Sequence, residues 1–508
     1  MKFLLKGRIE LSGEIGSAKK PLDEFLKNAD TSILAKGAPE GKGPRILKWT
    51  SEGNEIKIEI ESGTHVRAHE ALIRLKKGIG QELGKKYKMG ARSVVIDEYE
   101  ITIDLKQAPK KKFKVPFVES IDFSGEQCTI IFKNLNEEFI LNNYIDRILN
   151  LISKKVEDQF YEGKAEYWEL YWSSPEREAK WNLDPTEEMV KRGWLKQGPT
   201  KGKWFYKPEL TAIFRAMEKI AVEEILQPLG FQEVIEPHHV PFDVWIKTGH
   251  MTGSPNEIYY VSEPKTRDPE EWEAFRDYVY VTHKIDKEEL MKLIEIPNAG
   301  ICYAQCPVIY WALSNATISD KSLPLKLYDR SANSNRYESG GRHGIERVDE
   351  FHRLEPVYIG TAEQLLELRD KFIERYKYVF NEILELEWRM VWVTPWYLQQ
   401  SGQIEHEEAG EDKIKGTIDF ESYMPYRGSR KESEWLEFQN LSIIGDKFIK
   451  AFNIKPQKQK SELWSGCSGI GLERWTAAFL AQKSLEVESW PEKFQKVFGT
   501  MPEGIELL

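Results

Sequence analysis

The sequence predicts an α+β fold, and three observations lead to this prediction. The chain has 508 residues, which is enough for two or three domains with large cores. Several segments in the first third alternate apolar and polar residues, as half-buried strands do. Residues 209–230 instead repeat apolar residues at helical spacing. We predict a first domain at 1–165, a linker region at 166–205 and a large domain at 206–508.

The first domain is predicted to contain four strands and a basic helix. The strands are KFLLKGRIELS (2–12), EIKIEIES (55–62), SVVIDEYEITIDL (93–105) and CTIIFKNL (128–135). Residues 65–88 have helical spacing, and PKKKFKVP (109–116) is a basic loop. The helix carries Arg67, Arg74, Lys76, Lys77, Lys85, Lys86 and Lys88. Because Lys and Arg bind phosphates without reading sequence, this domain is expected to hold an RNA backbone, and a solvated helix face is the alternative.

The distribution of charge also favours a polyanionic partner. Residues 1–120 contain 24 Lys and Arg against 17 Asp and Glu, a balance of +7, in a chain whose net charge is −10. A basic first domain on an acidic body is typical of proteins that dock a nucleic acid. A chance difference between the two parts remains the alternative.

Cysteine usage and hydropathy predict a cytoplasmic protein with no membrane partner. The chain has four cysteines, which are too few for a disulfide framework. They are Cys128, Cys302, Cys306 and Cys467. The start, MKFLLKGRIELSG, returns to charge after three apolar residues, and no run approaches the ~18–20 apolar residues that cross a bilayer.

The linker region and the start of the large domain are predicted to contain three helices and a strand. Residues 155–172 are rich in aromatic side chains and are predicted to be helical. Asp184 before Pro185 predicts the capped start of a second helix. The long third helix is expected to end at Gly230, and the strand after it at Pro237.

Three later segments combine charged side chains and glycines in a way that suits nucleotide binding. They are NRYESGGRHGIERVDEFHRLE (335–355), EWLEFQNLS (434–442) and GCSGIGLERWTAAFLAQ (466–482). A guanidinium group can bind a phosphate oxygen through two parallel donors, and glycines let a nucleotide approach the backbone. Magnesium on phosphates prefers one or two carboxylates. Taken alone, the first segment could equally be a polar hairpin with surface salt bridges.

In this order, these segments resemble the motifs of class II aminoacyl-tRNA synthetases. The helix at 209–230 and the strand after it resemble the first motif, and segments 335–355 and 466–482 resemble the second and third. The resemblance implies a catalytic domain with an antiparallel sheet flanked by helices, ATP with magnesium, and a homodimer. The implied ATP-binding residues are Arg336 on the α-phosphate, Glu338 and Phe351 on adenine, Glu437 and Asn440 at magnesium, Arg474 on the γ-phosphate, and Arg347 with Val348. Arg336, Arg353 and Arg474 are the implied catalytic residues, and Arg353 is a rival for the α-phosphate.

Cys306, Glu355 and Cys467 are candidate metal ligands. Their separations of 49 and 112 residues form no sequence signature, so spacing alone favours buried structural cysteines. The chain looks most like the archaeal, zinc-dependent type of seryl-tRNA synthetase. In that family Cys, Glu and Cys at these motif positions bind zinc, and the open fourth position takes the serine amino group. The resemblance therefore implies one zinc per subunit, and Cys302 is interpreted as a core residue.

The same resemblance implies the substrates and partners. The enzyme would activate L-serine with ATP and transfer it to tRNA(Ser) and also to tRNA(Sec), with the first domain as the tRNA-binding module. The segment TPWYLQQSGQIEHEEAG (394–410) resembles a helix-turn-helix insertion that serine orders. The implied serine-binding residues are Ala304, Arg336, Glu355, Gln400 and Asn440.

Three rival functions remain at this point. An amino acid:carrier-protein ligase would share the active site but lack the tRNA-binding domain, which the basic first domain argues against. The second rival is a threonyl or other class II synthetase. Threonyl enzymes bind zinc with one Cys and two His, whereas the second and third motifs here offer Glu355 and Cys467. A non-catalytic RNA-binding regulator would not need an intact set of nucleotide-binding side chains.

Overall fold

The computed structural model divides the chain into two compact units, Met1–Ala165 and Glu166–Leu508. It describes residues 1–157, 159, 168–331, 333–338, 341–393, 416–458 and 462–505. The predicted linker region at 166–205 therefore falls within the second unit. No helix in the described part is long and apolar enough to span a membrane.

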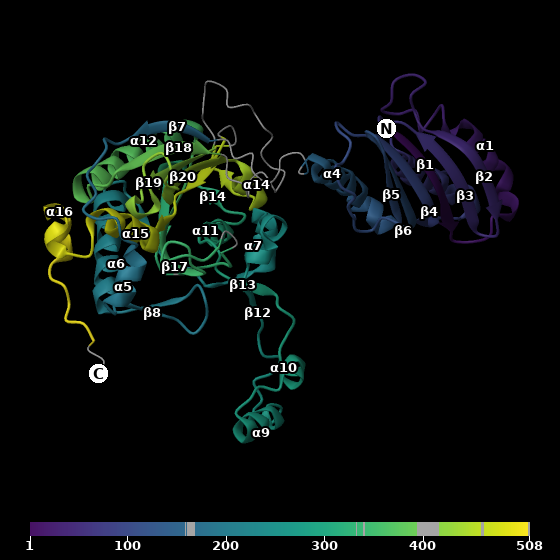
Figure 1. The fold of residues 1–508 in the computed structure, drawn as a ribbon. Coiled ribbons are helices and arrows are strands. Elements are labelled where there is room, and N and C mark those ends of the chain that lie inside the picture. Colours follow the sequence, from purple (N-terminus) through teal and green to yellow (C-terminus); the bar gives the residue numbers. More distant parts are fainter. Residues whose placement is uncertain are drawn as a thin grey trace. The chain divides into compact units, whose positions relative to one another are not determined.

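The first unit is an antiparallel sheet of six strands covered on one face by helices (Figure 1). The sheet order is β2-β3-β1-β4-β6-β5. The strands are β1 (Lys2–Leu11), β2 (Arg45–Glu52), β3 (Glu55–Ser62), β4 (Ala91–Asp104), β5 (Ser120–Ser124) and β6 (Gln127–Asn136). The helices are α1 (Lys19–Ala29), α2 (Ala68–Tyr87), α3 (Glu137–Leu141) and α4 (Tyr144–Glu157), after a short turn η1 (Gly16–Ala18). The four predicted strands and the basic helix are confirmed.

The two faces of this sheet differ in chemistry. Alternate residues of β1, such as Phe3 and Leu5, are fully buried and pack with the apolar side of α2 in one core. The residues between them point to the open face, where Lys6 pairs with Glu98 at 2.8 Å and other charges alternate in sign. Ion pairs therefore neutralise part of the open face, while the helical side also carries exposed basic residues such as Lys77.

The second unit is built on a mixed sheet of ten strands in its described part. The order is β10-β15-β17-β22-β20-β19-β18-β7, with β16 on β17 and β23 between β17 and β20. Within the described part of this sheet only β10 and β15 pair in parallel and the other neighbours are antiparallel, so the predicted antiparallel sheet is confirmed. The strands are β7 (Trp168–Ser173), β10 (Gln232–Val234), β15 (Leu325–Asp329), β16 (Asn333–Asn335), β17 (Glu350–Gly360), β18 (Trp388–Val393), β19 (Gly416–Ser422), β20 (Leu436–Gly445), β22 (Trp464–Cys467) and β23 (Ile470–Gly471).

Helices pack against this sheet around an aromatic core. They include α6 (Pro208–Ile220) with the π-helical turns η2 (Ala221–Leu226), α12 (Ala362–Tyr378) with η5 (Val379–Ile383), α15 (Leu472–Lys483) and α16 (Glu492–Phe498). Trp388, Phe380 and Trp475 meet there, with ring centroids 5.1 Å apart for Phe380 and Trp475. The long helix predicted at 209–230 is confirmed, and Gly230 follows it with a φ of +76° that suits glycine.

One element of the predicted linker region was assigned wrongly. The segment 155–172 was predicted to be helical, but α4 ends at Glu157 and residues 168–173 form the edge strand β7 beside β18. Strand β7 is rich in Trp and Tyr, and aromatic side chains of this kind suit a strand better than a helix. The capped helix is confirmed as α5 (Pro185–Lys191), because the Asp184 side chain accepts from Thr186 N at 2.8 Å. A hairpin of β8 (Leu195–Gln197) and β9 (Trp204–Tyr206) follows.

A small three-stranded sheet and its neighbours complete the unit. Its strands are β11 (His239–Pro241), β12 (Tyr260–Val261) and β13 (Ala299–Ile301), in the order β11-β13-β12. Nearby lie α7 (Phe242–Thr248), α8 (His250–Gly253), α11 (Cys306–Ala312) and α14 (Lys447–Ala451), and β14 (Thr317–Ile318) pairs with β21 (Lys455–Pro456). Short turns are η3 (Pro255–Glu257), η4 (Asp320–Ser322), η6 (Pro425–Arg427) and η7 (Val487–Ser489).

Between β12 and β13 the chain leaves the body as a narrow arm (Figure 1). The arm, residues 262–297, carries α9 (Glu273–Thr282) and α10 (Lys287–Leu293). Leu293 is the only buried residue in it. The arm is therefore held by its own backbone hydrogen bonds and local contacts rather than by a core.

Candidate functional site

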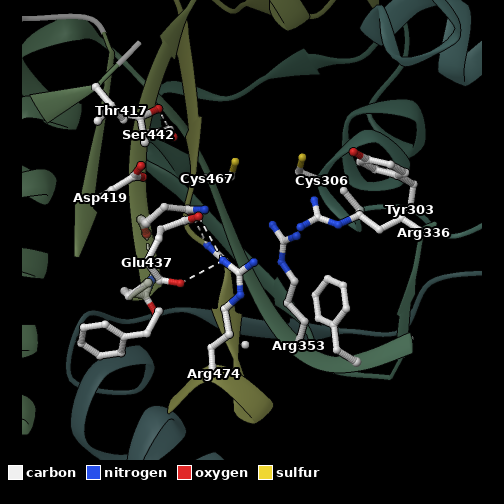
Figure 2. Close-up of a pocket in the computed structure, with 18 of the residues that line it drawn as sticks. Tyr303, Cys306, Arg336, Arg353, Thr417, Asp419, Glu437, Ser442, Cys467 and Arg474 are labelled. Carbon is white, nitrogen blue, oxygen red and sulfur yellow. Dashed lines mark hydrogen bonds and ion pairs between the residues drawn. The ribbon is translucent and has the colours of Figure 1, made fainter. Parts of the chain in front are cut away.

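A cavity of about 350 Å³ opens beside β17, β19 and β20 of the large sheet. Figure 2 shows 18 of the side chains that line it, and the lining residues come from segments far apart in the sequence, from Trp168 to Arg474. They include Tyr303, Ala304, Cys306, Arg336, Glu338, Val348, Phe351, Arg353, Glu437, Asn440, Cys467 and Arg474. The structure thus brings most of the predicted site residues to one place.

Cys306, Glu355 and Cys467 form a cluster at the deep side of this cavity. Each offers one ligand atom, and these atoms lie within 4.8 Å of one another. Cys306 begins α11, whereas Glu355 lies in β17 and Cys467 ends the neighbouring strand β22. Strand pairing therefore brings together two of the three residues, although they are far apart in sequence.

The chemistry of the cluster suits a divalent cation. All three side chains are buried, and neither oxygen of Glu355 has a partner with good hydrogen-bond geometry among the described residues, although Arg353 forms an ion pair with it. Burial raises the pKa of Glu355, and the neighbouring Cys306 thiol together with burial raises the pKa of Cys467. A cation would stabilise the ionised forms of all three groups, and two thiolates with one carboxylate leave a tetrahedral zinc one position open.

Cys302 is not part of this cluster. Its thiol is fully buried and donates to Glu236 Oε1 at 3.6 Å. Burial, followed by the neighbouring Asp329, raises the pKa of Glu236 to about 9. The interpretation of Cys302 as a core residue is consistent with this position.

Arg336 and Arg353 both reach the middle of the cavity (Figure 2). The Arg336 guanidinium lies over the rings of Tyr303 and Phe351, 5.5 Å from each centroid. Arg353 instead lies against Gly469, where a Cβ atom would be 2.6 Å from its Nη2 atom. Arg353 is therefore beside the cluster of Cys306, Glu355 and Cys467, since it pairs with Glu355, whereas Arg336 is held by the two aromatic rings.

Glu437, Asn440 and Arg474 form the opposite wall. Arg474 Nη1 donates to the Glu437 carboxylate at 3.0 Å and to its main-chain oxygen at 2.9 Å. Asn440 Oδ1 accepts from Gly469 N at 2.9 Å. The wall thus presents a carboxylate and a guanidinium that already interact, as a site for a metal–triphosphate complex would require.

Three predicted residues are not among the described residues that line the cavity. Glu355 is fully buried beside Cys306 and Cys467, which do line it. Arg347 lies outside it and pairs with Glu434, with Nη2 2.6 Å from Oε1. Gln400 and the predicted insertion at 394–410 lie outside the described residues.

The cavity also contains polar residues that sequence reasoning missed. His250 is fully enclosed and pairs with Thr248 Oγ1 at 2.8 Å, and burial lowers its pKa to about 3, so its ring is neutral. Thr417 and Ser442 share a hydrogen bond of 2.7 Å across β19 and β20. The only signal for this pair was a polar residue at inward positions of two apolar strands, a pattern too common to identify a site.

Comparisons with known proteins agree with this arrangement. Residues 1–154 match the family described as a tRNA-binding domain. Residues 298–483 match the tRNA synthetase class II core domain of the glycyl, histidyl, prolyl, seryl and threonyl enzymes. The prediction of an RNA-binding first domain before a class II catalytic domain is therefore confirmed.

Several relatives match over the full length of the chain, and these are seryl enzymes. The type-2 serine–tRNA ligases of Methanothrix thermoacetophila and Methanococcoides burtonii are each 46% identical, with 100% of both chains covered. The M. kandleri SerRS, solved in complex with A. aeolicus tRNASec, superposes with a TM-score of 0.85 at 30% identity, over 100% of this chain and 99% of that one. A cytoplasmic serine–tRNA ligase from Naegleria fowleri shares the fold, with a TM-score of 0.51 at 16% identity over 67% and 73% of the two chains.

Proposed function

The chain belongs to the type-2 serine–tRNA ligases, and we propose that it activates serine in this cavity with zinc held by Cys306, Glu355 and Cys467. The observation that carries the proposal is the position of the sulfur and carboxylate cluster beside two arginines in one cavity. Zinc at these ligands would bind the amino group of serine at its open position.

The second motif supplies the residues proposed for the nucleotide. Arg336 binds the α-phosphate, since its guanidinium is anchored over two rings and points into the cavity. Glu338 accepts from the adenine amino group, and Phe351 with Val348 contacts the ring. Arg347 reaches the terminal phosphates after leaving Glu434. These contacts are charge-assisted, so they strengthen as charge develops on the phosphate.

The opposite wall is proposed to bind the metal–phosphate end of ATP. Glu437 would hold magnesium with Asn440 beside it, and Arg474, which pairs with the Glu437 carboxylate, would bind the γ-phosphate. Arg353 fixes the Glu355 carboxylate and faces the serine carboxylate. The serine carboxylate then attacks the α-phosphate and pyrophosphate leaves, which gives seryl-adenylate. The terminal ribose hydroxyl of the tRNA attacks the seryl carbonyl, and AMP leaves as the ester forms. Positioning and fixed charge supply the rate without a protein general base.

Selectivity for serine is proposed to depend on polarity and on size together. Ala304 and Asn440 line the cavity and are proposed to complete the serine pocket, and Gln400, outside the described residues, keeps its proposed role in serine binding. A site that binds the hydroxyl group rejects alanine by up to about 10⁴–10⁵, because its polar groups would be left unpaired. Threonine has one more methyl group, and a difference of that size gives only about 10–200-fold. Threonine is therefore the harder substrate to exclude.

The first unit is proposed to bind the tRNA through its helical side. Lys77 is exposed on α2 and Lys88 at the cap that follows it. The basic loop at 109–116 is joined to Gln159, two residues beyond α4, by two 2.8 Å hydrogen bonds with Lys111. tRNA(Ser) is the substrate, and because the M. kandleri relative was solved with tRNASec, we include tRNA(Sec). We also propose a homodimer, built by the first-motif segment of α6 and β10.

Metal analysis with an exchange assay tests the proposal. Replacing Cys306 or Cys467 by Ser should remove about one zinc per chain and abolish serine-dependent ATP–pyrophosphate exchange, whereas replacing the buried Cys128 by Ser should leave both intact. A Cys467→Ser protein that kept both zinc and rate would refute the ligand set. Exchange with serine but no charging of tRNA would favour the carrier-protein ligase.

A further inference from the structure

The hairpin between β8 and β9 contacts the outer side of the second-motif loop, residues 341–349. Asp349 N donates to Gly202 O at 2.8 Å, and Trp204 Nε1 donates to Gly344 O at 2.9 Å. Gly202 has a φ of +79°, and a Cβ atom there would lie 2.7 Å from Arg342 Nε. Only glycine allows the two segments to approach so closely.

Asp349 is at the centre of these contacts. The residue is 1% exposed, and its carboxylate accepts from Arg342 Nη2 and from the Tyr259 hydroxyl, each at 2.7 Å, and from Arg342 Nε at 2.9 Å. Burial by itself would raise the pKa of Asp349, but hydrogen bonds from Arg342, the Glu338 amide and Tyr259 hold that pKa below its ordinary value. The side chain is therefore a buried carboxylate with every acceptor position in use.

Asp349 also holds segment 336–338, which carries the two proposed ATP contacts Arg336 and Glu338. Glu338 N donates to Asp349 Oδ1 at 3.0 Å, and Arg336 N donates to the Asp349 main-chain oxygen at 2.9 Å. Tyr337, between them, lies under the guanidinium of Arg342, which is itself bound to Asp349. Asp349 therefore binds the main chain of segment 336–338 at both of its ends. It also holds Arg342, which stacks on Tyr337 in the middle of the segment.

We propose that Asp349 is a positioning residue for ATP, which fixes the main chain at 336–338 and is in turn held by the β8–β9 hairpin. The inference rests on the proposed roles of Arg336 and Glu338. An Asn side chain in its place would turn an N–H donor toward Arg342, the Tyr259 hydroxyl or the Glu338 amide, which are themselves donors. Segment 336–338 would then lose one of the hydrogen bonds that hold it.

The test is serine-dependent ATP–pyrophosphate exchange by Asp349→Asn in the full-length chain. Because a hydrogen bond to a charged group is worth about 1.5–3 kcal/mol, KM for ATP should rise about tenfold or more. The preference for ATP over ITP, which lacks the adenine amino group, should fall because Glu338 is displaced. KM for serine and the zinc content should stay as in the wild type. Glu350→Gln is the matched control, since Glu350 is the next residue and its carboxylate contacts Lys203 at 3.6 Å and accepts from Asn333 Nδ2 at 3.3 Å, a hydrogen bond that the Gln oxygen can still accept.

A milder variant and a reference variant keep the outcome clear. Tyr259→Phe removes one hydrogen bond to Asp349 from outside the loop. It should raise KM for ATP by less than Asp349→Asn does and leave KM for serine unchanged. An unchanged KM for ATP in Asp349→Asn, or an equal rise of both KM values with a lower melting temperature, would overturn the inference. If Glu338→Gln leaves the ATP-to-ITP preference unchanged, the adenine role of Glu338 fails, and KM for ATP still decides about Asp349.

Discussion

Gly469 is the residue against which the Arg353 guanidinium lies. A Cβ atom there would be 2.6–2.7 Å from Nη2, Cζ and Nε, so Gly469→Ala must push Arg353 away from Glu355. Overpacking of this kind costs about 1–3 kcal/mol, so we expect kcat/KM for serine in the exchange assay to fall about tenfold to a hundredfold.

Gly471→Ala is the comparison variant for this prediction. A Cβ atom at Gly471 meets no atom within 4 Å, so Arg353 should stay in place and KM for serine should not change. If Gly469→Ala raises KM for ATP and leaves KM for serine unchanged, Arg353 rather than Arg336 binds the α-phosphate.

Lys483, at the buried end of α15, gives a prediction about pH. Burial lowers its pKa to about 8, below the 10.5 of an unfolded lysine. Between these values the unfolded chain binds more protons, so this residue contributes stability that rises with pH and is lost as pH falls through 8. Lys483→Met should therefore raise the melting temperature at pH 7 and lose most of this advantage near pH 10. Lys496→Met, on the exposed side of α16, should change neither value.

Single residues also show where sequence reasoning reached its limit. Cys306, Glu355 and Cys467 have no motif of their own, because strand pairing and the start of α11 bring them together. Only the resemblance to a family located them. Asp349 was passed over because an acidic residue in a polar loop has no special pattern, and its importance appears only in its burial and its partners.

Among the elements, α2 gives the prediction about tRNA. Arg74 and Lys76 bind within the unit, to Lys36 O and to the Glu137 carboxylate, so reversing their charge would disturb the fold. Lys77 on α2 and Lys88 at its C-terminal cap are both exposed. Replacing both by Glu should raise KM for tRNA and reduce the salt dependence of binding by about two counterions.

Exchange without tRNA should be unaffected by these two changes. Lys57→Glu, on the open face of the first sheet, is the matched control and should leave KM for tRNA near the wild-type value. If the control and the α2 variant weaken tRNA binding equally, the effect is one of net charge and not of the helix.

Elements with strong periodicity were predictable from the sequence. The strands of the first unit and the helix α6 were identified because one face of each is buried in a core. Strand β7 was missed because it is an edge strand whose exposed Trp168, Leu170 and Tyr171 give no alternation of apolar and polar residues. Its partner β18, more than two hundred residues away, decides its conformation.

At the scale of the whole molecule, the two units have separate cores, so each contains the contacts that it needs to fold. A chain that begins at Glu166 should therefore keep serine-dependent exchange with near wild-type KM values for ATP and serine. It should lose most charging of tRNA, because the basic helical surface is gone. Exchange and charging measured on the same preparation check this, and a loss of both would show that the first unit supports the catalytic cavity.

The arm at 262–297 leaves the body beside the point at which it returns, since Tyr260 on β12 pairs with Gly300 on β13. Its tip between α9 and α10 contributes nothing to any core. New chain ends placed at that tip would leave every strand of the large sheet joined as before. The gene can therefore be split there, with two polypeptides reassembling through the small sheet into one enzyme.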